Sequence, residues 1–346
     1  GDLDGDGKAE EPAQWGTYFA TTKNTVLKTS ATAGENQIMT RTKAENLILE
    51  DGKVTGVQAT MYDGTKVIAH ANKGVVLATG GYESNPEMIA KYDNPGLANI
   101  HLAPSQGNMG DGIVMAEKLG ADLVNMDLIQ LSCAVAPFSI QMQLPIKNNG
   151  VVFVNKEGKR FTNEYSEASS DRRITEDILK QTDAECFGVY NETIYQTFMA
   201  IEEKDFFDEY RMTGIDNSGT VIQADTLEEL AEKTGMKLDQ LKATITNFND
   251  YAKQGTDEQY HREAETMRPF DGTKYYAFPV KAEILNTQGG PKRNENAEIL
   301  HVNGNPIPHL YSAGEMGGIT SEHYQGGTNL AECIIFGQIA GKNAAA

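Results

Sequence analysis

Three glycine clusters in the C-terminal part of this 346-residue chain constrain its fold more than any other feature. They read LNTQGG at 285–290, SAGEMGG at 312–318 and YQGGTN at 324–329, and each stands where a turn or a helix is expected to follow an apolar stretch. Glycine has no Cβ, so its backbone can approach a flat or phosphorylated ligand closely. The N–H groups at a helix start also attract negative charge. With Glu315 placed to accept hydrogen bonds from sugar hydroxyls, the clusters predict a site for a large dinucleotide cofactor.

Composition narrows the functional classes. The chain has 30 basic and 49 acidic residues and a net charge of −19, which disfavours nucleic-acid binding. No apolar run reaches the length of a membrane span, and the first residues are not a targeting signal. Three cysteines (Cys133, Cys186 and Cys333) lie far apart, which argues against zinc and iron–sulfur sites. We expect a soluble bacterial protein of two domains, either cytoplasmic or exported.

Local patterns predict several elements. Strand-like runs at 46–50, 53–59 and 66–70 are separated by Asp-Gly pairs, which are strong hairpin signals. Residues 74–77 are apolar after the initial glycine and predict a strand buried on both faces. Asp111 is expected to cap a helix that ends before Gly120.

The central part of the chain is expected to be α+β. A capping-box-like sequence at 225–228 predicts a helix that Gly235 ends. The following helix carries an apolar stripe (Leu241, Ile245, Phe248 and Ala252), which we interpret as core.

Further motifs upstream complete a family pattern. GVVLATGGY at 74–82, GNMGDG at 107–112 and GVVFVNKEGKRFTNE at 150–164 precede the three glycine clusters. In this order the motifs resemble the fumarate reductase/succinate dehydrogenase flavoproteins, which include urocanate reductases and 3-ketosteroid dehydrogenases. The resemblance covers nearly the whole chain. It implies FAD as cofactor and an α/β fold, with a Rossmann-like FAD-binding domain (1–130 and 285–346) and an inserted α+β capping domain (131–284).

One family element is not found. These flavoproteins normally begin with a strand, a G-x-G-x-x-G turn and a helix that hold the ADP part of FAD. No such turn occurs before residue 74. We therefore expect this βαβ unit to be cleaved, disordered or supplied by a partner chain.

The resemblance assigns cofactor contacts to the glycine-containing turns and to two helix starts. The expected residues are Ala78, Thr79, Gly80, Gly81, Asn108, Gly110, Asp111, Gly112, Gly289, Gly290, Gly314, Glu315, Thr328, Asn329 and Leu330.

At the expected substrate site the chain departs from fumarate reductases. Their His-Pro-Thr motif falls at Ser132, their His-His-Thr motif at Leu285, and their clamping arginine at Tyr324; Lys147 lies where they carry Glu-Ala-Val-Arg-Gly. Each lost charge-assisted hydrogen bond costs about 1.5–3 kcal/mol of carboxylate binding. We therefore expect a neutral or partly hydrophobic substrate.

By resemblance, the protein is an FAD-dependent oxidoreductase acting on CH–CH groups. It would reduce or form a C=C bond conjugated to a carbonyl group, as an enone or enoate reductase or a ketosteroid-type dehydrogenase, with hydride passing through flavin N5. Tyr324 would polarise the carbonyl, or only pack on the flavin. Arg172 and Arg173 are the leading proton-transfer candidates, followed by Tyr165, unless these arginines only form an exposed helix turn.

Two alternatives remain open. A fumarate-type dicarboxylate reductase could draw its anchors from Lys147, Arg172 and Arg293. A non-catalytic fragment, or one half of a split flavoprotein, would work beside a partner chain. The electron donor is not specified by any motif.

The acidic start of the chain resembles half of a calcium loop. Asp2, Asp4 and Asp6 have EF-hand spacing, but Ala13 stands where the bidentate glutamate belongs. We favour a solvated acidic turn over a weak calcium site and predict no other metal.

Overall fold

The computed structural model describes residues 37–92, 96–97, 100–102, 107–135, 140–141, 149–165, 172–202, 219–324 and 327–346. Two compact units divide the chain: residues 1–45 with 58–68, and residues 46–57 with 69–346. The calcium prediction for Asp2, Asp4 and Asp6 lies outside the described residues.

A three-stranded meander comes first. Its strands are β1 (Thr42–Glu50), β2 (Lys53–Met61) and β3 (Lys66–His70), in the order β1-β2-β3. Asp51 (φ 50°) and Gly52 (φ 77°) both have positive φ, as a tight two-residue hairpin turn requires. The predicted strands and hairpins are confirmed.

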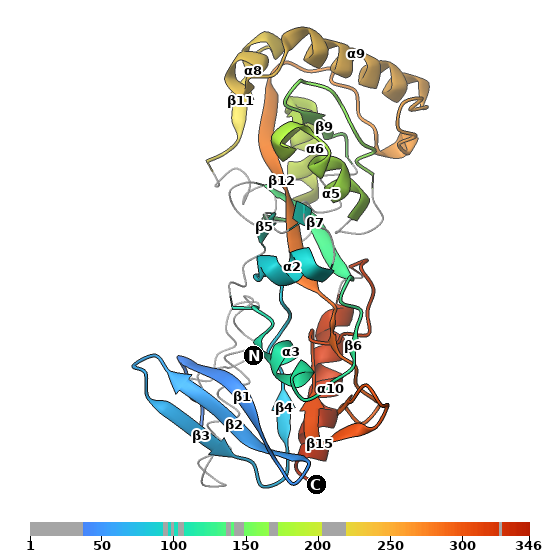
Figure 1. Cartoon of the computed structure of the whole chain (residues 1–346). Coiled ribbons are helices and arrows are strands. Elements are labelled where there is room, and N and C mark those ends of the chain that lie inside the picture. The colour runs from blue at the N-terminus through green and yellow to red at the C-terminus, as the bar shows by residue number, and fades with distance from the viewer. Residues whose placement is uncertain are drawn as a thin grey trace, which may run out of the picture. The chain divides into compact units, whose positions relative to one another are not determined.

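A seven-stranded sheet forms the largest layer, with the order β8-β7-β12-β10-β9. Its centre is β12 (Tyr275–Thr287), the long strand in Figure 1, which also pairs with β11 and β5. The other strands are β5 (His101–Leu102), β7 (Ile129–Val135), β8 (Ile140–Gln141), β9 (Val152–Asn155), β10 (Cys186–Asn191) and β11 (Ile222–Ala224). All seven residues of β7 are buried, so this strand lies in the interior.

Helices pack on this sheet and enclose the main hydrophobic core. Helix α5 contacts β7 and β12, α6 contacts β10, and α8 contacts β11, β12 and α9 (Figure 1). They span α5 (Arg172–Leu179), α6 (Glu192–Glu202), α8 (Leu227–Thr234) and α9 (Leu238–Gln254), with short 3-10 turns η2 (Thr182–Ala184) and η3 (Ala264–Thr266). Thr226 caps α8 by accepting from Glu229 N, so the cap lies one residue after the start of the predicted box at 225–228. Gly235 ends the helix with φ 77°, as predicted. Leu241, Ile245 and Phe248 are buried and Ala252 is partly buried against the same core, which confirms the core stripe.

The C-terminal elements form smaller sheets beneath a long helix. Strand β15 (Pro306–Ser312) pairs in parallel with β4 (Val75–Leu77) and antiparallel with β14 (Glu298–Leu300). Helix α10 (Thr328–Ala344) packs on β15 and β4. The remaining elements are α2 (Pro86–Tyr92), α3 (Asp111–Glu117), β6 (Leu123–Val124) and β13 (Gly290–Pro291).

Two local predictions were wrong. Val76 in β4 is 37% exposed, so this strand is not buried on both faces. Asp111 is the first residue of α3 rather than its cap, because Gly110 takes the N-cap position in a left-handed conformation (φ 78°). A left-handed cap favours glycine over aspartate.

Candidate functional site

The turn after β4 admits no side chain at its second glycine. A Cβ on Gly81 would lie 2.1 Å from Thr287 Oγ1 and 2.5 Å from Glu315 Oε1. Tyr82 N also donates to Thr287 Oγ1 over 3.1 Å. The turn is thereby held against the end of β12.

The second motif, at 107–112, contacts the same turn. Gly110 N donates to Gly81 O over 3.0 Å, and a Cβ on Gly112 would lie 2.1 Å from Thr79 Oγ1. Gly80 similarly leaves room for the Asn108 side chain, whose Oδ1 would be 2.6 Å from an added Cβ. The main structural effect of these glycines is therefore to let protein segments approach one another.

The C-terminal clusters meet in the same way. Gly317 N donates to Gly289 O over 3.1 Å, and a Cβ on Gly290 would lie 2.4 Å from Gly317 N. Thr287 N donates to Glu315 Oε1 over 3.0 Å. The structure thus gathers the predicted turns at 78–81, 107–112, 287–290 and 314–317 into one region.

Two carboxyl groups face each other in this region. Asn108 Nδ2 donates to Glu315 Oε2 over 3.2 Å and also to Glu83 Oε1. Burial and the nearby Glu83 carboxylate raise the pKa of Glu315 to about 8. Burial also raises the pKa of Glu83. Burial thus shifts the pKa values of both carboxyl groups upward.

A buried ion pair fixes the Ala-Gly-Glu turn to α10. The side chains of Arg293 and Glu332 form this pair and are 1% and 4% exposed. Arg293 Nη1 also donates to Met316 O over 2.9 Å, and Glu332 Oε1 accepts from Ile319 N over 3.2 Å. Burial lowers the pKa of Arg293 to about 10. Arg293 was a possible dicarboxylate anchor in the fumarate-type alternative, but its guanidinium group is engaged in the ion pair with Glu332.

The start of α10 presents uncapped backbone. Its N-cap, Gly327, has φ 87° and supplies no side-chain hydrogen bond, so the first turn keeps its positive dipole end. Thr328 and Leu330 are exposed. Asn329 instead turns inward, because its Nδ2 donates to Gln130 Oε1 over 2.8 Å.

The two candidate arginines at the start of α5 have different surroundings. Arg172 Nη1 donates to Ile129 O over 3.0 Å, and its Nε pairs with Glu176 over 2.8 Å. Arg173 donates to Thr162 Oγ1 over 3.0 Å and to Tyr165 O over 3.1 Å. Arg172 therefore reaches the end of β7 that faces the 320–329 loop, whereas Arg173 supports the 162–165 segment.

Tyr324 and its neighbours lie in the loop before α10. Tyr324 is half-buried. The His323 side chain is 68% exposed and lies 3.7 Å from Glu322. Its carbonyl, rather than its imidazole, faces the interior and accepts from Gln130 Nε2 over 3.4 Å.

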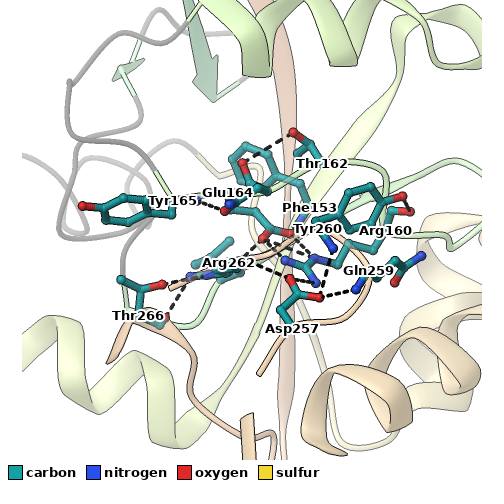
Figure 2. A network of polar contacts seen from close by, with 12 residues as sticks. Phe153, Arg160, Thr162, Glu164, Tyr165, Asp257, Gln259, Tyr260, Arg262 and Thr266 are labelled. Carbon is teal, nitrogen blue, oxygen red and sulfur yellow. Dashed lines mark hydrogen bonds and ion pairs between the residues drawn. The ribbon is translucent and has the colours of Figure 1, made fainter. Parts of the chain in front are cut away.

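A buried charge network supports the 160–164 motif (Figure 2). Glu164 is paired with Arg160 over 2.8 Å and with Arg262 over 2.9 Å, and Arg160 is paired with Asp257 over 2.7 Å. The two arginines hold the pKa of Glu164 below its usual value despite burial. Figure 2 shows the Tyr165 ring directed away from this network. The motif is thus a structural anchor, and Tyr165 lies beside it.

Sequence reasoning missed three residues of this region: Glu83, Thr287 and Gln130. Glu83 follows the Gly80–Gly81 turn by two residues, and Gln130 interrupts an apolar strand. A polar residue within an apolar strand needs partners when buried, which could have marked Gln130. Thr287 carries no such signal, because its partners come from distant segments.

A comparison of the sequence with models of protein families shows which family the chain belongs to. The model described as "FAD binding domain" matches residues 6–330. The chain belongs to this family. FAD is therefore its cofactor, and the predicted family, fold class and cofactor are confirmed.

Individual relatives agree. The NADH:acrylate oxidoreductase of Vibrio harveyi is 35% identical over 89% of this chain and 30% of its own length. The urocanate reductase of Eggerthella lenta is 32% identical over 90% of the chain and 51% of its own length. An open flavocytochrome c3 fumarate reductase structure superposes with a TM-score of 0.80 at 29% identity, covering 97% of this chain and 56% of that one. The chain thus spans about a third to a half of these relatives.

The gathered turns fit a bound FAD. Ala78, Thr79 and Thr328 are exposed, and a Cβ on Gly107 or Gly327 would meet nothing within 4 Å. Asn286 Oδ1 and Gln288 Nε2 are buried and lack a hydrogen-bond partner among the described residues, so cofactor groups could supply one.

The described residues hold no group of three or more His, Cys, Asp or Glu side chains placed to bind a metal ion. None of their helices has the length and apolar character needed to cross a membrane.

Proposed function

We propose that this chain forms the FAD- and substrate-binding part of an oxidoreductase that reduces, or in reverse forms, a C=C bond conjugated to a carbonyl group. One observation carries the proposal. Arg172 bonds Ile129 O, and the adjacent Gln130 bonds the loop that carries Tyr324 and the start of α10. The Arg172 side chain and the loop that carries Tyr324 are thus hydrogen-bonded to the same end of β7. Both residues are suited to activating a conjugated carbonyl.

Each residue has a distinct chemical task. Bound FAD supplies hydride exchange. Tyr324 donates a hydrogen bond to the carbonyl oxygen as negative charge develops there. Arg172 exchanges a proton at the α-carbon. The ordinary pKa of arginine is about 12.5 or higher, so this exchange needs a carboxylate relay, and Glu176 lies 2.8 Å from Arg172 Nε. Asp171 and Glu167, two further carboxylates near Arg172 in the sequence, lie outside the described residues.

We infer an enone or enoate rather than a dicarboxylate as substrate. Arg293 is held by Glu332, and Ser132 is buried at 1% exposure and carries no charge. The relatives named for acrylate and urocanate support a conjugated C=C substrate class. Lys147 lies outside the described residues.

We also propose the domain boundaries and cofactor contacts expected from sequence. The seven-stranded sheet and its core support a capping domain at 131–284, with the flanking parts (1–130 and 285–346) holding FAD. The gathered turns support cofactor contacts at 78–81, 108–112, 289–290 and 314–315, and the uncapped α10 supports contacts at 328–330.

Turnover with a reduced dye tests the proposed activity. The FAD-loaded chain is assayed with a cyclic enone, an enoate and fumarate. Tyr324→Phe should lower kcat by about 10²–10³-fold, the typical loss for one oxyanion donor. Tyr62→Phe is the matched control, because Tyr62 is 86% exposed. Turnover of fumarate alone would instead support a dicarboxylate reductase.

A split flavoprotein is the second candidate, and an exposed apolar surface favours it. Leu330, Ile334 and Ile335 on α10 are 43%, 49% and 55% exposed. Contiguous apolar surface of this kind is typical of an interface. We propose that a segment carrying the G-x-G-x-x-G turn, in a longer chain or a partner chain, covers it. Co-purification of such a polypeptide with FAD would support this candidate.

A further inference from the structure

Gln130 is a buried amide in an otherwise apolar part of β7. It is 0% exposed, so each of its polar atoms needs a partner. Its Nε2 donates to Ser321 O over 2.7 Å and to His323 O over 3.4 Å. Its Oε1 accepts from Asn329 Nδ2 over 2.8 Å. All of these side-chain hydrogen bonds therefore go to the loop before α10 and to the first turn of that helix.

These partners lie on both sides of Tyr324 in the sequence. Ser321 and His323 precede it, and Asn329 follows it in the first turn of α10. Thr320 Oγ1 donates to Asn329 Oδ1 over 2.8 Å, so Gln130, Asn329 and Thr320 close the base of the loop. Tyr324 itself lies in neither a helix nor a strand. Its backbone position depends on how this base is held.

We propose that Gln130 is a positioning residue that fixes the Tyr324 loop relative to Arg172. Ile129, its neighbour in β7, accepts the hydrogen bond from Arg172 over 3.0 Å. One strand thereby sets the spacing between the carbonyl-polarising group and the proton-transfer group. The inference rests on the proposed function, because it assigns Gln130 a role through Tyr324.

Two substitutions separate hydrogen bonding from packing. Gln130→Leu keeps the approximate volume and removes both the donor and the acceptor. Gln130→Glu keeps the acceptor for Asn329 but can donate to Ser321 O only when its carboxyl is protonated. Asn249→Leu is the matched control, since the side-chain amide of Asn249, on α9, makes two hydrogen bonds to the backbone of Phe270.

The first readout, amide hydrogen exchange in residues 319–324 of the FAD-loaded chain, is independent of activity. We expect faster exchange there in Gln130→Leu and wild-type exchange in Asn249→Leu. Unchanged exchange in Gln130→Leu overturns the inference. This readout tests whether Gln130 anchors the Tyr324 loop, whether or not the wild type is active. Absence of turnover of any conjugated carbonyl by the wild type would contradict the proposed function and not the anchoring.

The second readout is kcat against pH. A misplacement of about 1 Å costs on the order of 10²-fold, so Gln130→Leu should lose about that factor while retaining FAD. Gln130→Glu should recover wild-type kcat at acidic pH, where its carboxyl can donate. Wild-type kcat in Gln130→Leu, or no recovery in Gln130→Glu at any pH, overturns the positioning role.

Discussion

At the residue scale, the site depends on contacts that leave no room for added atoms. Gly81 lies between Thr287 and Glu315, and its missing Cβ is what lets the β4 turn touch β12. The motif predicted a glycine for approach to a ligand, whereas the structure uses this glycine for approach between segments.

Gly81→Ala should therefore destabilise the chain and impair FAD retention. The new Cβ would lie 2.1 Å from Thr287 Oγ1, and overpacking of this kind costs about 1–3 kcal/mol. Urea unfolding and FAD content measure the two effects. Gly337→Ala is the control, because its Cβ meets nothing within 4 Å in α10 and should raise stability by up to about 1 kcal/mol. Equal stability of Gly81→Ala and wild type would contradict this account.

Glu315 should make the stability of the FAD-free chain depend on pH. Its pKa is raised from 4.5 to about 8, so the folded state holds a proton that the unfolded state has released. The free energy of unfolding should then fall by about 1.4 kcal/mol per pH unit between these values. Glu315→Gln should reduce this decline and leave only the part that Glu83, whose pKa is also raised, contributes, as followed by thermal unfolding from pH 4.5 to 8. A decline of the same slope in the variant would show that another group causes it.

At the element scale, the Arg160–Glu164–Arg262–Asp257 network joins the 151–165 segment to the 257–266 segment. Its four side chains are at most 2% exposed. Removing one member leaves an opposite charge buried without compensation, which is far more costly than breaking a surface pair.

Glu164→Gln should lower the free energy of unfolding by about 3–5 kcal/mol, because Arg160 and Arg262 both lose a charged partner. Chemical denaturation measures this loss. Lys156→Gln, which breaks exposed pairs with Asp183 and Glu185, should cost less than about 1 kcal/mol. Since the pKa of Glu164 is lowered by folding, its contribution is present at neutral pH and is lost as the pH falls. A similar loss of unfolding free energy in both variants would contradict the claim that burial makes the Glu164 ion pairs more costly to break than the exposed Lys156 pairs.

Local features of this fold could be predicted from sequence, and distant pairings could not. The Asp51–Gly52 hairpin and the Gly235 helix end depend on the conformational preferences of one or two residues. The roles of Gln130 and Glu164 depend on partners 191 and 98 residues away, respectively, which no local pattern specifies. Gly110 occupies the N-cap position predicted for Asp111, because the local sequence is compatible with both a left-handed glycine cap and an aspartate side-chain cap.

At the scale of the whole molecule, α10 has an apolar surface that the described residues do not cover. Only Glu332 and Ala340 are buried along its 17 residues, although its sequence includes Leu330, Ile334 and Ile335. In the split-flavoprotein proposal, this is the surface that the G-x-G-x-x-G segment covers.

Ile335→Glu should weaken association with that segment without unfolding this chain. Ile335 is 55% exposed, so a carboxylate there is solvated in the isolated chain but would be buried in the interface. The measurement is sedimentation and FAD retention after mixing with the strand–G-x-G-x-x-G–helix segment of a relative. Val302→Glu, at a 68% exposed turn residue, should leave both unchanged. Tight FAD binding by the isolated chain, equal in wild type and Ile335→Glu, would show that α10 needs no partner to complete the cofactor site.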